Sequence, residues 1–216
     1  MKLLPKRQKL DKQNLLNIRI VLDRSGSMQG AESITIAALN TYLEELKKDK
    51  VKGLITLSTF DTISIDIPIT NQSIESIKAF NPEILQPRGG TPLFDAIGAA
   101  IYDHENIKNT SDDKKVLVIV TDGLENASRE YSLENISKKI KEKENAGWLI
   151  IYLGADHDAI KQAKGLNFNL QRSIHYSKKD SIDAFKAVQR TTRDYSRGTG
   201  NKSISFTEDE RRKSDK

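Results

Sequence analysis

The stretch NIRIVLDRSGS, residues 17–27, decides the fold. It begins as an apolar run rich in β-branched residues, which is typical of a buried strand. It ends in a turn with one carboxylate and two hydroxyls, on Asp23, Ser25 and Ser27. In a parallel sheet, ligands bind beyond the carboxyl ends of the strands. Four interpretations of the turn are open: a helix cap, a phosphate cradle, a nucleophile and part of a metal site.

The rest of the chain alternates between apolar runs and helical patterns. Further strands are predicted over 53–60, 62–70, 115–122, 147–154 and 167–171, and helices over 31–48, 73–80, 92–107, 132–146, 157–165 and 180–196. Near-continuous apolar strands separated by helices favour an α/β fold. We expect a doubly wound, mostly parallel central sheet of about six strands, with helices on both faces. Residues 62–70 alternate in polarity around a proline, so they predict one antiparallel edge strand.

The length and the charge distribution predict one folded domain with polar ends. The 216 residues suit a single domain. We expect a basic N-terminal extension over 1–15, a domain over 16–196 and a polar, disordered tail over 197–216. The net charge of +5 resides mainly in the termini, where residues 1–19 carry six Lys/Arg against one Asp. Solvated termini explain this charge, and weak attachment to nucleic acid is the alternative.

Several classes of protein are excluded or disfavoured by composition. The chain contains no cysteine, which excludes disulfides, thiolate metal sites and cysteine nucleophiles. The basic N-terminus lacks the apolar core of a signal peptide. No apolar run approaches the length of about 20 residues that a membrane helix needs. We therefore expect a cytoplasmic protein.

Oxygen donors gather at the predicted carboxyl edge of the sheet. Besides the first turn, Thr91 lies in a Gly-Gly-Thr-Pro loop and Asp122 ends the strand 115–122. Two carboxylates and three hydroxyls suit Mg²⁺, Mn²⁺ or Ca²⁺ rather than Zn²⁺. Because two carboxylates leave no surplus negative charge on a divalent cation, the carboxylate of a ligand could complete its shell.

This combination resembles the metal-ion-dependent adhesion site of von Willebrand factor A domains. Asp23-x-Ser25-x-Ser27, Thr91 in GGTP and Asp122 in TDG fill all five positions of that motif. The resemblance covers about residues 16–196 and is strongest to small stand-alone bacterial and phage members. It implies a doubly wound fold whose metal site binds a protein partner through an Asp or Glu. It also implies that the three hydroxyls are direct ligands and that the two aspartates act mainly through water.

Residues near this edge have a functional and a plainer interpretation. We expect a partner-binding rim formed by Arg24, Gly90, Glu125 and Asn126. For Glu125 and Asn126 the alternatives are support of the ligands and a solvated loop. Asp61 follows the second strand and favours a turn role. His157 and Asp158 favour a helix start, and His104 and His175 show no metal spacing.

Catalysis is the less favoured class of function. The serines are not in a Gly-x-Ser-x-Gly elbow, and no Gly-x-x-x-x-Gly-Lys-Ser/Thr loop is present. We expect a non-catalytic protein-binding domain that depends on a divalent cation, with Mg²⁺ favoured and Mn²⁺ or Ca²⁺ possible. The alternatives are a nucleic-acid-associated module that uses the basic termini and a metal-dependent hydrolase.

Overall fold

A computed structural model describes residues 15–106, 113–155, 157–177, 181–198 and 204–214. One six-stranded sheet forms its centre, in the order β3-β2-β1-β4-β5-β6. Its strands are β1 Leu16–Asp23, β2 Gly53–Phe60, β3 Ile65–Ser73, β4 Lys114–Thr121, β5 Leu149–Gly154 and β6 Ser173–His175. All neighbouring strands are parallel except β2 and β3. The expected fold class, with one antiparallel edge strand, is confirmed.

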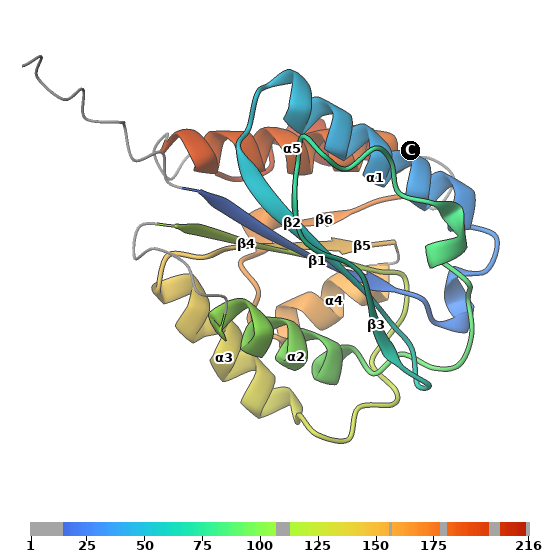
Figure 1. The fold of residues 1–216 in the computed structure, drawn as a ribbon. Helices are drawn as coiled ribbons and strands as arrows, with labels where there is room; N and C mark the ends of the chain where they lie inside the picture. Colours follow the sequence, from blue (N-terminus) through green and yellow to red (C-terminus); the bar gives the residue numbers. More distant parts are fainter. Residues whose placement is uncertain (1–14, 107–112, 156, 178–180, 199–203, 215–216) are drawn as a thin grey trace, which may run out of the picture.

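Helices cover both faces of the sheet (Figure 1). The helices α1 and α5 lie on one face, and α2, α3 and α4 lie on the other. The α-helices are α1 Glu32–Lys48, α2 Leu93–Asn106, α3 Leu133–Asn145, α4 His157–Gly165, α5 Ile182–Arg197 and α6 Glu208–Ser214. Three short 3-10 helices are η1 Gly26–Met28, η2 Pro82–Ile84 and η3 Leu170–Arg172. None of the helices in the described ranges has the length and apolar character that a membrane span requires.

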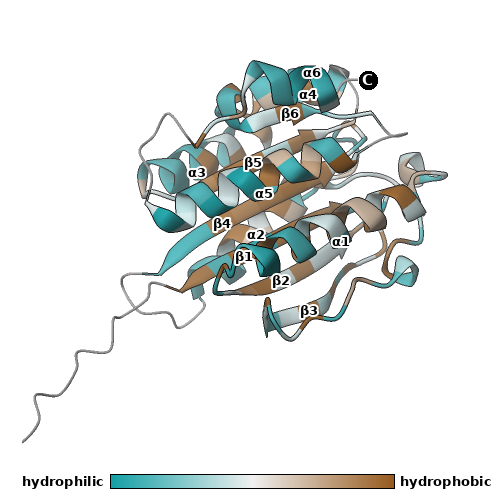
Figure 2. Ribbon diagram, turned by 90° about the horizontal axis from the view of Figure 1, so that it is seen from above, coloured by the Kyte–Doolittle hydropathy of each residue, from teal (hydrophilic) through white to brown (hydrophobic). Residues whose placement is uncertain are grey.

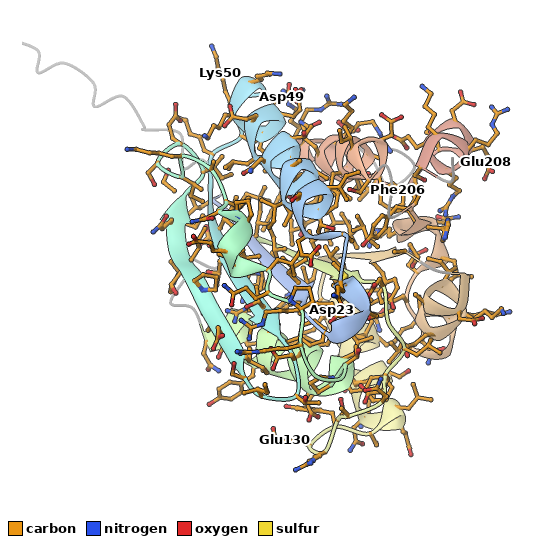
Figure 3. The ribbon with its side chains drawn as sticks, turned by 90° about the vertical axis from the view of Figure 1, so that its right-hand side faces the viewer. Asp23, Asp49, Lys50, Glu130, Phe206 and Glu208 are labelled. Carbon is orange, nitrogen blue, oxygen red and sulfur yellow. The ribbon has the colours of Figure 1, made fainter. Side chains whose placement is uncertain are left out.

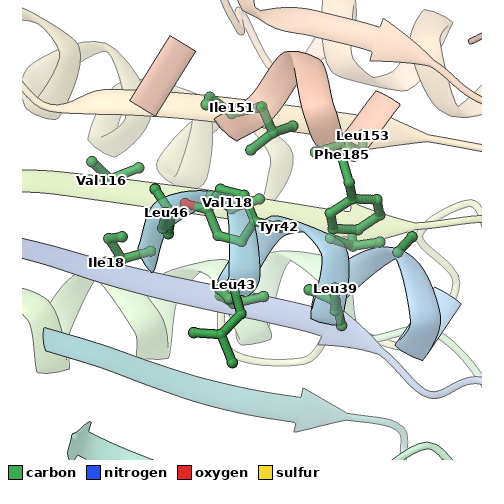
Figure 4. Packing of buried hydrophobic residues seen from close by; sticks show 14 of the residues in the cluster. Ile18, Leu39, Tyr42, Leu43, Leu46, Val116, Val118, Ile151, Leu153 and Phe185 are labelled. Atoms are coloured by element: carbon green, nitrogen blue, oxygen red, sulfur yellow. The ribbon is translucent and has the colours of Figure 1, made fainter. Parts of the chain in front are cut away.

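The apolar side chains of the sheet form two cores, one on each face. In Figure 2, seen from above, the central strands are mostly brown, whereas the helices carry more teal. On one face, Tyr42 and Leu43 of α1 and Phe185 of α5 pack onto β1, β4 and β5 (Figure 4). On the other face, α2, α3 and α4 cover the second set of buried side chains. Because both faces are buried, the central strands read as near-continuous apolar runs in the sequence.

The strand order changes direction at β1. The chain passes from β1 outward to β2 and β3, and then returns to place β4 on the opposite side of β1. At such a switch point, the loops that follow the two central strands diverge and leave a crevice at their carboxyl ends. Asp23 ends β1 and Asp122 directly follows β4. The topology therefore brings these two carboxylates to the same place.

The edge strand is found at β3, and Pro68 lies in it, because an edge strand tolerates a missing N–H. Two other elements differ from the sequence prediction. Residues 74–76 form a turn instead of the short helix expected over 73–80. The strand expected over 167–171 is replaced by η3, and the short strand β6 follows it at Ser173–His175.

Part of the expected disordered tail is ordered. Ile204 and Phe206 are buried, and α6 packs against α5 and β6. Arg190 of α5 holds α6 through hydrogen bonds of 2.5 and 2.9 Å to the Glu210 carboxylate. The polar sequence of this region is thus stabilised by ion pairing, which hydropathy does not reveal. The basic extension expected over 1–15 lies almost entirely outside the described residues.

Candidate metal centre

The carboxylates of Asp23 and Asp122 are buried side by side at the switch point. Their residues are 0% and 6% exposed. Figure 3 labels Asp23 where β1 leads into the η1 turn. Buried carboxylates need hydrogen bonds or a cation, because an ionised group loses its hydration when it leaves water. The surrounding hydroxyls supply part of this compensation.

Asp23 fixes the turn that follows its own strand and also the end of the neighbouring strand. Its Oδ1 accepts a hydrogen bond of 2.7 Å from the backbone N–H of Ser25. Its Oδ2 accepts a bond of 2.5 Å from the Thr121 hydroxyl, at the end of β4. The same hydroxyl oxygen accepts a bond from the N–H of Gly123. Asp23 therefore sets the relative position of the two loops that carry the other site residues.

The two serines and Asp122 form a chain of short hydrogen bonds. The hydroxyl oxygens of Ser25 and Ser27 lie 2.9 Å apart. The Ser27 hydroxyl donates to Oδ1 of Asp122 over 2.6 Å. Ser25 and Asp122 are buried and Ser27 between them is exposed, so the chain links two buried groups through a residue at the surface.

Thr91 reaches the same point from a third loop. A Cβ atom built onto Gly123 would lie 2.9 Å from the Thr91 hydroxyl oxygen, 3.1 Å from that of Ser27 and 3.6 Å from Oδ2 of Asp23. Three oxygen atoms, two from the end of β1 and its turn and one from the Thr91 loop, therefore converge beside Gly123 of the loop after β4. The structure brings together all five residues that the sequence predicts as a metal site.

Burial shifts the protonation of the site. The pKa of Asp23 is raised to about 6, chiefly because burial disfavours the charged form. The hydrogen bonds from Thr121 and Ser25 oppose this shift, and the charge of Asp122 adds to it. A bound cation would favour the ionised carboxylate, because it places a positive charge beside it.

Asn126 and Glu125 support the loop that carries Thr91. The side-chain oxygen of Asn126 accepts a hydrogen bond of 2.9 Å from the N–H of Thr91. The Glu125 carboxylate accepts bonds from the N–H groups of Phe94, Ala127 and Ser128 and from the Ser128 hydroxyl. The sequence leaves open whether Glu125 and Asn126 support the ligands or lie in a solvated loop. These contacts match support of the ligands.

The structure places Arg24 away from the expected rim. The residue is only 7% exposed. Its guanidinium donates to the carboxylates of Asp61 and Asp66 and to the Ser64 hydroxyl. The sequence predicts Arg24 as part of the rim, and it could not show that partners more than 30 residues away hold the side chain inward. Gly90 is partly exposed, and its N–H donates to the Thr62 hydroxyl over 3.2 Å.

The other candidate residues have contacts outside the five-residue site. Asp158 is exposed and pairs with Lys161 one turn later in α4. His104 is buried and its ring packs edge-on against Trp148. Arg88, which sequence reasoning did not single out, donates through Nε to Asp61 over 2.8 Å. Its position three residues before Thr91 is the signal that could have drawn attention to it.

The donor set fits a hard divalent cation. In the described part of the chain, no group of three or more His, Cys, Asp or Glu side chains is arranged to hold a metal ion. A cation at the switch point would therefore depend on hydroxyl ligands beside the two carboxylates. Such oxygen donors match Mg²⁺ and Mn²⁺, which keep several water ligands in protein sites.

Comparisons with solved structures show the same fold in distant proteins. Proximal thread matrix protein 1 from the mussel byssus matches with a TM-score of 0.62 and 14% identity, over 82% of this chain and 48% of its own. The manganese-loaded TRAP protein of Plasmodium vivax matches with a TM-score of 0.58 and 13% identity, over 90% of this chain and 75% of its own. A von Willebrand factor type A protein from Catenulispora acidiphila matches with a TM-score of 0.58 and 14% identity, over 84% and 43%. The chain thus spans about half the length of the first and less than half of the third.

Sequence comparison identifies the family. No sequence match was found among curated proteins. The sequence model of the von Willebrand factor type A domain matches residues 18–125, which is half of the 216 residues. This segment runs from β1 to the loop after β4, so it includes Asp23, Ser25, Ser27, Thr91 and Asp122. The chain belongs to the von Willebrand factor type A domain family.

Proposed function

We propose that this chain is a non-catalytic binding domain that captures a protein partner through a divalent cation. We call Asp23, Ser25, Ser27, Thr91 and Asp122 together the metal centre. The observation that carries the proposal is the convergence of Thr91 Oγ1, Ser27 Oγ and Asp23 Oδ2 beside Gly123. Two segments that meet only through the fold supply these atoms beside a third, the loop of Gly123, and all three atoms are hard oxygen donors.

The protein's residues would divide the work of holding the cation. The hydroxyls of Ser25, Ser27 and Thr91 would be the direct ligands. Asp23 and Asp122 would orient these hydroxyls and the water molecules of the site, and they would balance the positive charge. When bound, the cation supplies a strong electrostatic attraction for an Asp or Glu carboxylate of the partner. Mg²⁺ is the favoured ion, and Mn²⁺ or Ca²⁺ would be accepted by the same donors.

The family supports both parts of the proposal. Von Willebrand factor A domains commonly mediate protein interactions, and they commonly bind a divalent metal. The Plasmodium vivax structure that shares this fold is loaded with manganese. Its identity of 13% shows the fold alone, so the support for metal binding rests on the donors present in this chain.

Binding is favoured over catalysis by the sequence context of the two serines. The Ser27 hydroxyl donates a hydrogen bond to Asp122, and the Ser25 oxygen lies within hydrogen-bond distance of the Ser27 oxygen. This chain of bonds fixes both serines as oxygen donors at the end of β1. Neither serine lies in a Gly-x-Ser-x-Gly turn, which presents the nucleophile in hydrolases of this fold class.

The partner would also contact the surface around the metal centre. Leu124 directly follows Gly123 and is 48% exposed. Asn126 is exposed and Gly90 is partly exposed. We assign these three residues to the partner-binding rim, where apolar contact and hydrogen bonds would supply specificity. Substitution of Leu124 by Ser is expected to weaken partner binding without weakening cation binding.

Affinity capture tests the proposed function. The immobilised protein is incubated with lysate of its source cells, once with Mg²⁺ and once with EDTA. We expect a protein that is retained with Mg²⁺ by the wild type, released by EDTA and not retained by Asp122→Ala. Asp103→Asn is the control. It removes the 2.7 Å ion pair between Asp103 of α2 and Arg19 of β1, which lies away from the metal centre. Retention that is the same with EDTA, or the same on Asp122→Ala, contradicts the proposal.

A further inference from the structure

Asp61 lies between the strands β2 and β3 and does more than form their turn. It is 2% exposed. Its Oδ1 accepts hydrogen bonds from the N–H groups of Ile63, over 2.6 Å, and of Ser64, over 3.1 Å. These two bonds are the turn role that the sequence predicts. They leave the second carboxylate oxygen for other partners.

The second oxygen of Asp61 holds two arginines from different loops. Arg24 Nε and Arg88 Nε each donate to Oδ2 over 2.8 Å. Arg24 lies between Asp23 and Ser25, and Arg88 lies three residues before Thr91. The Asp61 carboxylate thus contacts two segments, the one that carries Ser25 and Ser27 and the one that carries Thr91. We call Asp61, Arg24 and Arg88 the Asp61 clamp.

Backbone hydrogen bonds show that the clamped segments run alongside each other. The N–H of Arg88 donates to the carbonyl of Arg24 over 2.9 Å. The N–H of Gly26 donates to the carbonyl of Gly89 over 3.0 Å. The position of Thr91 relative to Ser25 and Ser27 is therefore set by this contact, and the clamp holds the contact from the side of β2.

Asp61 supplies the buried negative charge of the clamp, and the half-exposed Asp66 adds a second one, 2.8 Å from Arg24 and 4.0 Å from Arg88. The guanidinium groups of Arg24 and Arg88 meet at one oxygen, and the Arg24 side chain is largely buried. Two cations this close repel each other unless a negative charge lies between them. Burial alone would raise the pKa of Asp61, but hydrogen bonds from Arg88, Ile63 and Ser64 and the charge of Arg24 lower it below its ordinary value. The carboxylate therefore stays ionised and keeps both arginines in place.

We propose that Asp61 is a positioning residue of the metal centre, which sets the spacing between the Ser25–Ser27 turn and Thr91 without contacting the cation. The inference rests on the proposed cation binding. Residues that orient metal ligands through hydrogen bonds typically change metal affinity about 10- to 100-fold when they are substituted. Asp61 would act in this way through Arg24 and Arg88.

The test is a titration of the full chain with Mn²⁺, followed by electron paramagnetic resonance, together with thermal unfolding of the metal-free protein. Asp61→Asn keeps the size of the side chain but removes the charge between the arginines. We expect its Mn²⁺ affinity to fall about 10-fold. Asp103→Asn is the matched control, because it breaks the pair between Asp103 of α2 and Arg19 of β1. It should lower the melting temperature without changing the Mn²⁺ affinity.

Two further variants keep the outcomes distinct. Arg88→Lys removes the Nε contact at a residue that is 41% exposed in its side chain, so the fold is retained and the affinity should fall several-fold. If Asp61→Asn does not fold, this variant decides. If Asp61→Asn and Arg88→Lys bind Mn²⁺ with unchanged affinity while Asp122→Ala has lost Mn²⁺ binding, the inference about Asp61 is overturned and the proposed function stands. If Asp122→Ala binds Mn²⁺ as the wild type does, the proposed function fails and the inference fails with it.

Discussion

The hydroxyl of Ser27 donates a hydrogen bond of 2.6 Å to Oδ1 of Asp122, which lies 95 residues further along the chain. The bond joins the loop after β1 to the loop after β4 across the switch point of the sheet. It is one of the contacts through which three separate loops act as a single site. A substitution in one of these loops should therefore affect oxygen donors that belong to the others.

Gly123→Ala should abolish cation binding and leave the fold intact. Its Cβ would lie 2.9 Å from the Thr91 hydroxyl oxygen and 3.1 Å from that of Ser27, which is closer than carbon and oxygen normally approach. Both hydroxyls would have to move away from the position where they converge. The measurement is a Mn²⁺ titration beside a circular dichroism spectrum.

Gly26→Ala is the control for this substitution, because its Cβ would meet only the Gly89 carbonyl oxygen at an ordinary distance of 3.4 Å. We expect this variant to keep most of its Mn²⁺ affinity. Equal affinity in Gly123→Ala and the wild type would show that the converging oxygens do not hold the cation.

Glu125→Ala should destabilise the protein by about 2 kcal/mol, because it removes the acceptor for three backbone N–H groups and one hydroxyl. Equilibrium unfolding in urea measures this change. Glu125→Gln keeps one carbonyl oxygen and should lose less. If Glu125→Ala is as stable as the wild type, the carboxylate is not needed to hold the start of α2.

Gly98→Ala should also destabilise the protein, although alanine usually favours a helix over glycine by about 0.5–1 kcal/mol. The new Cβ would lie 2.3 Å from the ring of Tyr131, which packs directly on α2. Overpacking of this kind costs about 1–3 kcal/mol. A double-mutant cycle with Tyr131→Ala tests the cause, since the cost of Gly98→Ala should disappear once the ring is absent. A cost that persists without the ring would refute this explanation.

Acid should destabilise the protein in part through His104. Burial, with the positive charges of Lys115 and Arg19, lowers the pKa of His104 from 6.5 to about 3. Between these values the unfolded chain binds a proton that the folded chain does not, so stability falls as the pH drops through this range. Melting temperatures at pH 7 and pH 4.5 should differ less in His104→Leu than in the wild type. An equal difference in both proteins would contradict the assignment.

The sequence predicts the sheet, and it predicts that the five candidate site residues lie together, because both depend on local patterns. The strands β1, β4 and β5 are buried on both faces, so their apolar runs identify them without knowledge of the fold. The metal-centre residues follow strand ends or precede a helix, and parallel topology alone brings such positions to one edge. The five residues could therefore be grouped before their contacts were known.

The rest depends on contacts between segments that are distant in sequence. Arg24 is turned inward because Asp61 and Asp66 meet it from the loop after β2 and from the edge strand. The helix α6 is held by Arg190, and the three-residue strand β6 is too short to produce a pattern of its own. For Arg24 and α6, a polar side chain has a paired partner that hydropathy cannot indicate.

The most direct test of the account is a calorimetric titration of the metal-free protein with Mg²⁺, in the wild type and in Asp122→Ala. The account predicts a single saturable site in the wild type that is lost in the variant, with an unchanged circular dichroism spectrum. A wild type that shows no saturable binding, or an Asp122→Ala variant that binds Mg²⁺ with the same affinity, would contradict the claim that the loops after β1 and β4 hold a functional cation.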